Sequence, residues 1–298
     1  MLNIVYYTSG LTGSGRIVRG ISIGNALVRK NIDCKFVIVS SCRFGNLAER
    51  CGFRHIEIPY ENENQLSQNH YRESVLYSSL MELKPDILIV DLQWFSISAF
   101  IETLDCRKVF LCTQLNIPSI DKIYFTISLE DQILRFNPKQ YDLLVEAEPT
   151  NVNIPMIKIN PLIIRNREEI LPKEEALKRL GVKEAEKNCL FAFNGNPGEF
   201  EEKKKIYSYL EEEGYTFVYT TNYKQGLFPA ADYFNAFDLL IIGAGYNAFW
   251  EAVYFEKEAI FCPIERRFES QRFRTETCQD YIFRENGADQ LVELLIEL

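Results

Sequence analysis

Short apolar runs alternate along the chain with longer amphipathic segments, and this alternation constrains the fold more than any other feature. In the first half we expect strands at Asn3–Tyr7, Lys35–Val39, Ile56–Pro59, Ile87–Val90, Val109–Cys112 and Leu143–Val145. Between them we expect helices at Ile17–Lys30, Gly45–Cys51, Gln65–Leu83 and Ser98–Leu104. Strands that are apolar along their whole length are typical of parallel sheets covered on both faces. The alternation therefore predicts an α/β fold with a doubly wound sheet.

The same pattern starts again after a polar stretch between Asn160 and Arg167. There we expect strands at Cys189–Phe193, Phe217–Thr220, Leu239–Ile242 and Ala259–Cys262. We expect helices at Pro172–Leu180, Glu199–Glu213, Asn247–Phe255, Gln271–Phe283 and Ala288–Glu297. The length suits two domains of ordinary size. We therefore predict two Rossmann-like domains, residues 1–162 and 163–298, that face each other across a cleft.

Composition excludes several classes of protein. The 298 residues are 47% hydrophobic and 25% charged, which is typical of a globular chain. No apolar run approaches the roughly 20 residues that a membrane-spanning helix needs. Met1 leads directly into the first strand, so we expect no signal peptide. The net charge of −9 makes a nucleic-acid partner a poor candidate.

Charge distribution and cysteine usage bear on location. Residues 1–164 carry 16 basic and 17 acidic groups, whereas residues 165–298 carry 17 and 25. The first half could therefore lie against an anionic membrane face with little repulsion. Eight cysteines without a Cys-x-x-Cys spacing favour reduced thiols in a cytoplasmic protein. His55 and His70 have no partner at metal-ligand spacing, so we expect no metal site.

A first glycine turn, with Gly13, Gly15 and Arg16, separates the first strand from the first helix. Such a turn lets backbone amides approach an anion or a sugar, and the start of the helix adds a positive partial charge. A tight strand-to-helix connection would use the same glycines, so this alternative stays open. The chain has no Gly-Lys-Ser/Thr sequence, which argues against a P-loop.

A second glycine turn, with Gly243 and Gly245, follows the apolar strand at 239–242 and opens a helix that carries Asn247. Amides at this turn could hold a diphosphate. Glu251, one turn further, could accept hydrogen bonds from ribose hydroxyls. The Gln271 amide can donate to and accept from sugar hydroxyls. Taken singly, Glu251 could be a solvated helix acid and Gln271 an ordinary residue at a helix start.

Two segments resemble a known family. Gly13–Leu27 resembles the Gly-x-Gly-His-x-x-Arg segment that opens GT-B glycosyltransferases related to MurG, the peptidoglycan N-acetylglucosaminyltransferase. The order Asp238, Glu251, Pro263, Gln271 is similar to the donor-site signature of that family. The resemblance implies a GT-B fold and transfer of a sugar, such as an N-acetylhexosamine, from a UDP-sugar substrate.

The family carries out this transfer without a bound metal, and the resemblance implies no other cofactor. It implies that the nucleotide-sugar donor binds residues 163–298 and that the acceptor lies against residues 1–162. The sequence leaves the acceptor unidentified, and a lipid- or polysaccharide-linked acceptor would suit a protein peripheral to the inner membrane face.

The resemblance also implies roles for single residues. Glu251 would bind the ribose, Gln271 the donor sugar, and Arg165, at the end of an Asn-Pro hinge segment, the diphosphate. A loop after the second domain's first strand would hold the donor phosphate with Asn194, Gly195, Asn196 and Gly198. Arginines beside Gln271 could hold an anion or merely offset the acidic domain: Arg266, Arg267, Arg272 and Arg274.

Arg16 stands where the family usually has a histidine. Arginine stays protonated and cannot accept a proton, although it can clamp a phosphate. We therefore expect the catalytic base at Asp91, just past an apolar strand, where α/β sheets build their sites; a helix N-cap or a loop acid is the alternative. Two other functions stay open, a nucleotide-sugar hydrolase of the same fold and a non-catalytic nucleotide-sugar-binding protein.

Overall fold

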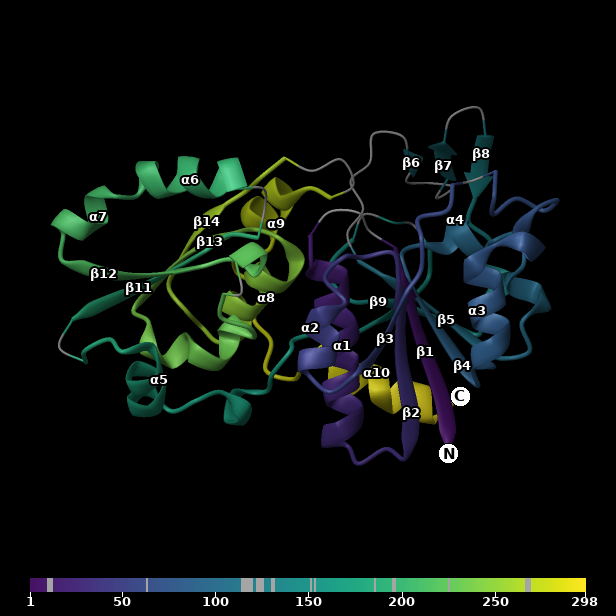
Figure 1. Ribbon diagram of the computed structural model, residues 1–298, viewed down its shortest axis with the longest axis horizontal. Coiled ribbons are helices and arrows are strands. Elements are labelled where there is room, and N and C mark those ends of the chain that lie inside the picture. The colour runs from purple at the N-terminus through teal and green to yellow at the C-terminus, as the bar shows by residue number, and fades with distance from the viewer. Residues whose placement is uncertain are drawn as a thin grey trace.

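The computed structural model describes the chain except residues 10–12, 63, 114–119, 122–125, 130–131, 151, 153, 185, 195–196, 225 and 266–268, and for 120–121, 126–129, 132–134 and 224 it describes the backbone alone. Two parallel sheets with helices packed on them make up most of the described chain (Figure 1). The predicted α/β architecture with two sheets is confirmed.

The first sheet has seven parallel strands in the order β10-β9-β5-β4-β1-β2-β3. Their bounds are β1 (Leu2–Thr8), β2 (Cys34–Ser40), β3 (Arg54–Glu57), β4 (Ile87–Asp91), β5 (Arg107–Cys112), β9 (Leu143–Glu146) and β10 (Ile157–Lys158). The strand order reverses between β1 and β4. In open α/β sheets, ligands bind at such a reversal, beyond the carboxyl ends of the strands.

The strands of this sheet are apolar on both faces because helices cover both. Ile4 of β1 belongs to one buried cluster with Ile21 of α1 (Gly15–Arg29). Its neighbour Val5 points to the opposite face and clusters with Leu80 of α3 (Val75–Leu83). Successive side chains of a strand alternate between faces, so a continuous apolar run is what two covered faces require.

The second sheet has four parallel strands in the order β12-β11-β13-β14. These are β11 (Lys187–Ala192), β12 (Tyr215–Thr220), β13 (Leu239–Gly243) and β14 (Ala259–Cys262). The helices of this half are α5 (Lys173–Leu180), α6 (Pro197–Ile206), α7 (Tyr209–Glu212), α8 (Tyr246–Tyr254) and α9 (Gln271–Thr277). Within the described residues, no helix is both long enough and apolar enough to cross a bilayer.

Some predicted elements differ from the structure. The helix predicted at Ser98–Leu104 is wrong: α4 (Trp94–Ile97) comes earlier, and a single 3₁₀ turn lies at Ile101–Thr103. The Ser98 hydroxyl donates to the Phe95 carbonyl (3.1 Å), a local bond that competes with helix continuation.

Two further helices are shorter than predicted, and one small sheet was not expected. α3 begins only after Ser74, whose hydroxyl caps the Tyr77 amide (3.0 Å), and α9 ends at Thr277. α2 (Asn46–Arg50) lies within the predicted range. A small antiparallel sheet of β6 (Ile120–Asp121), β7 (Thr126–Leu129) and β8 (Gln132–Arg135) was not predicted.

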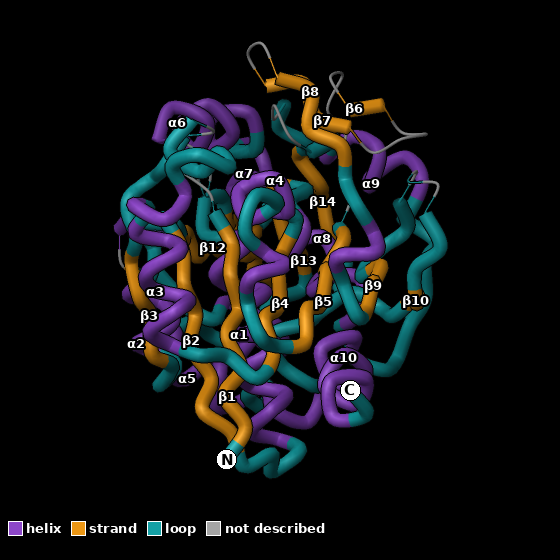
Figure 2. The backbone as a smooth tube through the Cα atoms, turned by 90° about the vertical axis from the view of Figure 1, so that its right-hand side faces the viewer, coloured by secondary structure: helices purple, strands orange, loops and turns teal. Residues whose placement is uncertain are grey.

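The last helix, α10 (Gly287–Ile296), returns to the first sheet and packs beside α1, near the N-terminus (Figures 1 and 2). Arg29 of α1 is ion-paired with Asp289 of α10 (2.7 Å) and with Glu169 (3.0 Å), and Lys30 is ion-paired with Glu293 (2.6 Å). The C-terminal segment therefore stabilises the half of the molecule in which the chain begins.

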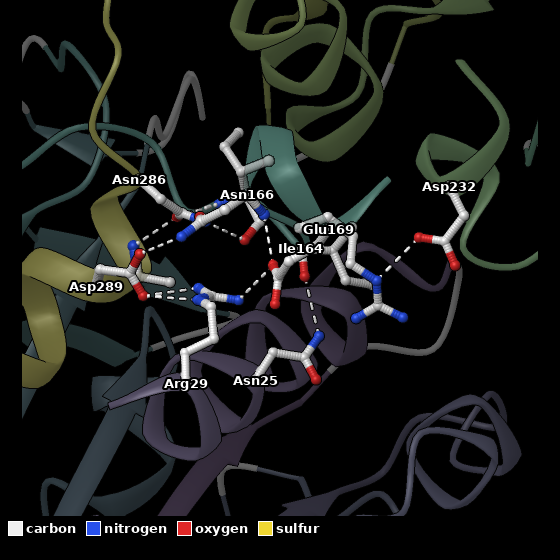
Figure 3. Close-up of polar contacts among 11 residues, drawn as sticks. Asn25, Arg29, Ile164, Asn166, Glu169, Asp232, Asn286 and Asp289 are labelled. Carbon is white, nitrogen blue, oxygen red and sulfur yellow. Dashed lines mark hydrogen bonds and ion pairs between the residues drawn. The ribbon is translucent and has the colours of Figure 1, made fainter. Parts of the chain in front are cut away.

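The segment that joins the two sheets is held by polar contacts at the start of α10 (Figure 3). The Asn286 side chain accepts from the Ile163 amide (3.0 Å) and donates to the Ile163 carbonyl (2.8 Å). Asn25 of α1 donates to the Ile164 carbonyl (2.9 Å), and Asn166 donates to Asp289 (2.8 Å). The joining segment is thus fixed by both α1 and α10.

Candidate functional site

The two glycine turns meet between the sheets. α1 begins at Gly15, just past the carboxyl end of β1, and α8 begins at Tyr246, just past the carboxyl end of β13. The Asn247 side-chain amide donates to the Gly15 carbonyl (2.9 Å), which brings the amino ends of α1 and α8 together between the two sheets (Figure 1). Both ends carry positive partial charge, so the junction favours an anion.

A second bridge joins the loop after β12 to the first turn. The Asn222 side chain donates to the Ser14 hydroxyl (2.7 Å), and the Asn222 amide donates to the side-chain oxygen of Asn194 (2.7 Å). Asn194 follows β11, so the carboxyl ends of β1, β11 and β13 converge on one place. The sequence predicted Asn194 but missed Asn222 and Ser14, because nothing in their local pattern indicates a contact between distant segments.

Glu251 lies one helical turn after Asn247, on the same face of α8. Only 8% of the residue is exposed, and no hydrogen bond or ion pair from the described residues reaches its carboxylate, whose oxygens keep some contact with solvent. Burial, with a smaller contribution from Asp232, raises the pKa of Glu251 to about 8, although Arg165 opposes the shift. A buried carboxylate without protein partners destabilises a fold, and such groups occur where a ligand completes the site.

Arg165 and Asp232 form the charged surroundings of Glu251. The Arg165 guanidinium Nε lies 2.9 Å from the Asp232 carboxylate, and both side chains are partly exposed. Asp232 lies on the 3₁₀ helix Ala230–Ala236 (Figure 3). The structure therefore places the predicted Arg165 near the predicted Glu251, with Asp232 as a neighbour that the sequence did not indicate.

Gln271, at the first turn of α9, lies over the second glycine turn. A Cβ atom built on Gly245 would lie 3.7 Å from the Gln271 side-chain nitrogen. The Gln271 oxygen accepts from the Ile264 amide (2.9 Å), and its nitrogen donates to Glu269 (2.9 Å). The amide is held in one orientation beside Gly245, as a sugar-binding group at that turn would have to be.

Of the arginines near Gln271, the structure buries Arg274 and exposes Arg272. Arg274 is 1% exposed and binds the carboxylates of Glu148 and Glu269, so its guanidinium is fully engaged within the protein. The prediction that Arg274 could hold an anionic ligand is therefore wrong. Arg266 and Arg267 lie outside the described residues, as do Gly195 and Asn196 of the phosphate-loop prediction, while Gly198 lies in the first turn of α6.

Asp91, the predicted base, is part of a buried ion pair. It is 0% exposed, and Arg19 contacts both its oxygens, with Nε at 2.9 Å from one and Nη2 at 3.0 Å from the other. The Tyr6 hydroxyl donates to the same carboxylate. A carboxylate bound in this way has to leave Arg19 before it can accept a proton, so its role as base stays a prediction that the ion pair opposes.

Arg16 lies beside this pair and points across the first turn. The Arg16 guanidinium donates to the Ser9 carbonyl. When the Gln93 side-chain amide is oriented with its oxygen toward Arg16, that oxygen accepts from Nη2 (3.2 Å). Burial lowers the pKa of the Arg16 guanidinium. The nearby charge of Asp91 opposes this shift, and the positive charge of Arg19 adds to it. The Arg16 side chain therefore bridges the ends of β1 and β4, where the strand order reverses.

A separate cavity of about 410 Å³ lies at the opposite edge of the first sheet. Its lining comes from the amino ends of β1, β4 and β5 and from the end of α10, with Leu2, Asp86, Arg107 and Leu295 among the residues. Parallel sheets bind ligands at the carboxyl edge, so this cavity is not the site considered above.

No protein-family model matches the chain, and no curated protein matches it. Solved structures match in three dimensions. Glycosyltransferase SsfS6 of Streptomyces sp. SF2575, complexed with thymidine diphosphate, is 11% identical, with a TM-score of 0.60 over 100% of both chains. Acinetobacter baumannii MurG is 10% identical, with a TM-score of 0.53 over 99% of this chain and 91% of its own.

A glycosyltransferase from Rickettsia africae ESF-5 is 12% identical, with a TM-score of 0.54 over 99% of this chain and 87% of its own. At these identities the likeness concerns the fold alone. The GT-B fold expected from the sequence is confirmed, and so is the structural resemblance to MurG.

Proposed function

We propose that this chain is a glycosyltransferase that moves a sugar from a nucleoside diphosphate sugar to an acceptor. The observation that carries the proposal is Glu251, a largely buried residue one turn beyond the glycine turn that opens α8, whose carboxylate has no hydrogen-bond or ion-pair partner among the described residues. Vicinal ribose hydroxyls would supply the donors that this carboxylate lacks. Because hydrogen bonds favour the ionised form, a ligand there would relieve the cost of its burial.

The rest of the junction fits the chemistry of glycosyl transfer. A departing diphosphate needs positive partial charge that is already in place, and the amino ends of α1 and α8 provide it. Gln271 would contact the sugar beside Gly245. The hydrogen bonds from Asn222 to Ser14 and from Asn247 to Gly15 span the junction. A diphosphate that binds between the two helix ends would have to break these hydrogen bonds.

The donor nucleotide is proposed to be UDP, and the sugar an N-acetylhexosamine, on the strength of the resemblance to MurG. SsfS6 was solved with thymidine diphosphate, which makes dTDP the second candidate to test. The acceptor is proposed to bind residues 1–162, at the ends of β1 and β4, where Arg16 could hold an acceptor phosphate or carboxylate.

One observation favours a second candidate function, a nucleotide-sugar-binding protein that does not transfer sugar. Arg16 replaces the family base, and Asp91 is held by Arg19. Incubation with UDP-N-acetylglucosamine separates the cases. UDP release only with an added acceptor supports the transferase, sugar release to water supports a hydrolase, and binding without turnover supports the binding protein.

The raised pKa of Glu251 predicts how donor binding depends on pH. Below about pH 8 the free carboxyl is protonated, and binding to the ionised form has to release that proton. The affinity for UDP-N-acetylglucosamine is therefore expected to rise by up to about tenfold per pH unit between pH 6 and pH 8, and to level off above that. Calorimetry between pH 6 and pH 9 measures this affinity. UDP-N-acetylglucosamine suits the test because its diphosphate, esterified at both ends, does not titrate in this range.

Glu251→Gln is expected to flatten this profile and to weaken binding at pH 8.5 by about tenfold, the value of one charge-assisted hydrogen bond. Glu256→Gln, two residues past the end of the same helix and exposed, is the matched control and should keep the parental profile. Parental affinity and pH dependence in Glu251→Gln would remove Glu251 from the donor site.

A further inference from the structure

A continuous chain of charged side chains, of which Glu148 and Arg274 are buried and Glu269 is partly exposed, runs from the first sheet to the second glycine turn. It starts at Glu148, two residues past β9, which is 2% exposed. Arg274 of α9 binds Glu148 with two parallel hydrogen bonds, Nε to one oxygen (2.8 Å) and Nη2 to the other (3.0 Å). The Trp250 indole nitrogen of α8 donates to the same carboxylate (2.8 Å). The carboxylate thus ties α8 and α9 to the end of β9.

The other end of the same guanidinium faces the proposed donor site. Arg274 Nη1 lies 3.0 Å from a Glu269 oxygen and donates to the Ala244 carbonyl (3.2 Å) within the glycine turn. The second Glu269 oxygen accepts from the Gln271 side chain (2.9 Å). Arg274 therefore reaches both the backbone of the turn and the carboxylate that orients Gln271.

The geometry requires an arginine. One cation serves two carboxylates and a carbonyl, and it does so through three nitrogens held in one plane. Burial alone would lower the pKa of Arg274, but Glu148 and Glu269 outweigh burial and raise it. Burial raises the pKa of Glu269, yet Arg274 and Gln271 bring it below its ordinary value. Arg274 and Glu269 both stay charged at neutral pH, so the contact between them does not change over this range.

We infer that Arg274 is a positioning residue of the donor-sugar site. It sets the orientation of the Gln271 amide through Glu269. Because its other partner is Glu148, this geometry depends on how the second sheet docks on the first. The inference rests on the proposed function. It predicts that a change at Arg274 affects the part of the binding energy that comes from the sugar, because Gln271 is the residue that would contact the sugar.

The test compares two ligands, UDP and UDP-N-acetylglucosamine, by calorimetry on the full chain. The measured quantity is the dissociation constant for UDP divided by that for UDP-N-acetylglucosamine. This ratio isolates the contribution of the sugar to binding and falls when that contribution is lost. Arg274→Lys keeps the charge but loses the planar fork, and we expect it to lower the sugar's contribution about tenfold, as for one misplaced hydrogen-bonding group. The affinity for UDP should change by less than about twofold.

Glu269→Gln is a second variant that leaves the pair between Arg274 and Glu148 in place, and it should lower the same ratio. Arg179→Lys, in an exposed ion pair with Glu175, is the control and should leave both constants unchanged. An unchanged ratio in both folded site variants, or an equal loss for both ligands, would overturn the positioning role. If the parent protein binds neither compound, the proposed function fails, and this assignment fails with it.

Discussion

Replacing Arg19 with alanine is expected to lower the free energy of unfolding by about 3–5 kcal/mol, the usual cost of removing one partner from a buried ion pair. Arg19 contacts both oxygens of Asp91, and neither side chain is substantially exposed. After the substitution, only the Tyr6 hydroxyl and the more distant Arg16 would compensate the Asp91 charge. Urea unfolding of both proteins at neutral pH measures the difference.

Asp91→Asn is expected to destabilise in the same range, because it leaves the Arg19 charge unpaired. The combined replacement Arg19→Met and Asp91→Leu should recover most of the loss, since neither charge is then buried. Arg107→Ala, in an exposed pair with Asp142, is the control and should cost less than about 1 kcal/mol. An Asp91→Asn protein with parental stability but no transfer activity would contradict this account and would support Asp91 as the base.

Gly287→Ala is expected to cost about 3 kcal/mol or more, because no space exists for the added methyl group. A Cβ atom at this position would lie 1.6 Å from the Asn160 carbonyl oxygen and 2.9 Å from the Pro161 carbonyl carbon. Both obstacles are backbone atoms of the segment that joins the sheets, so α10 or that segment would have to move. Thermal unfolding monitored by circular dichroism measures the loss.

Gly214→Ala separates steric collision from backbone strain. Gly214 has a φ of 88°, but a Cβ atom there would meet nothing within 4 Å. The expected cost is about 1–2 kcal/mol, from the left-handed backbone alone. If Gly287→Ala proves no more costly than Gly214→Ala, α10 is not packed against the joining segment as described.

The runs of apolar residues were sufficient to predict the two parallel sheets except for strand β10, whereas the small antiparallel sheet of β6, β7 and β8 was missed. Every predicted strand overlaps an observed one, because runs such as Ile87–Val90 and Leu239–Ile242 can be buried only within a covered parallel sheet. Helix ends were harder to predict, since local contacts decide them: the Ser74 cap starts α3, and nothing in the spacing of apolar residues marks it. The return of α10 to α1 involves buried apolar contacts and ion pairs between residues about 260 positions apart.

For the candidate site too, some features could be predicted from the sequence and others could not. Residues on glycine turns and on the first turns of helices, such as Gly245, Asn247 and Gln271, could be placed at the carboxyl edge of the sheet from the order of strands and helices, while their role in donor binding stays a prediction. The partners of buried charges could not. The sequence shows that Asp91 and Arg274 are charged, but only the fold shows that Arg19 and Glu148 contact them.

The proposed function requires a nucleoside diphosphate to bind at the carboxyl edge of the second sheet, beside the turn between β13 and α8. A crystal structure of the full chain grown with UDP would reveal this binding. We expect density for the diphosphate at the start of α8, with ribose hydroxyls about 3 Å from the Glu251 carboxylate. Density at the cavity near Leu2 and Leu295, or a junction of Asn247 and Gly15 that stays closed and without nucleotide at saturating UDP, would contradict it.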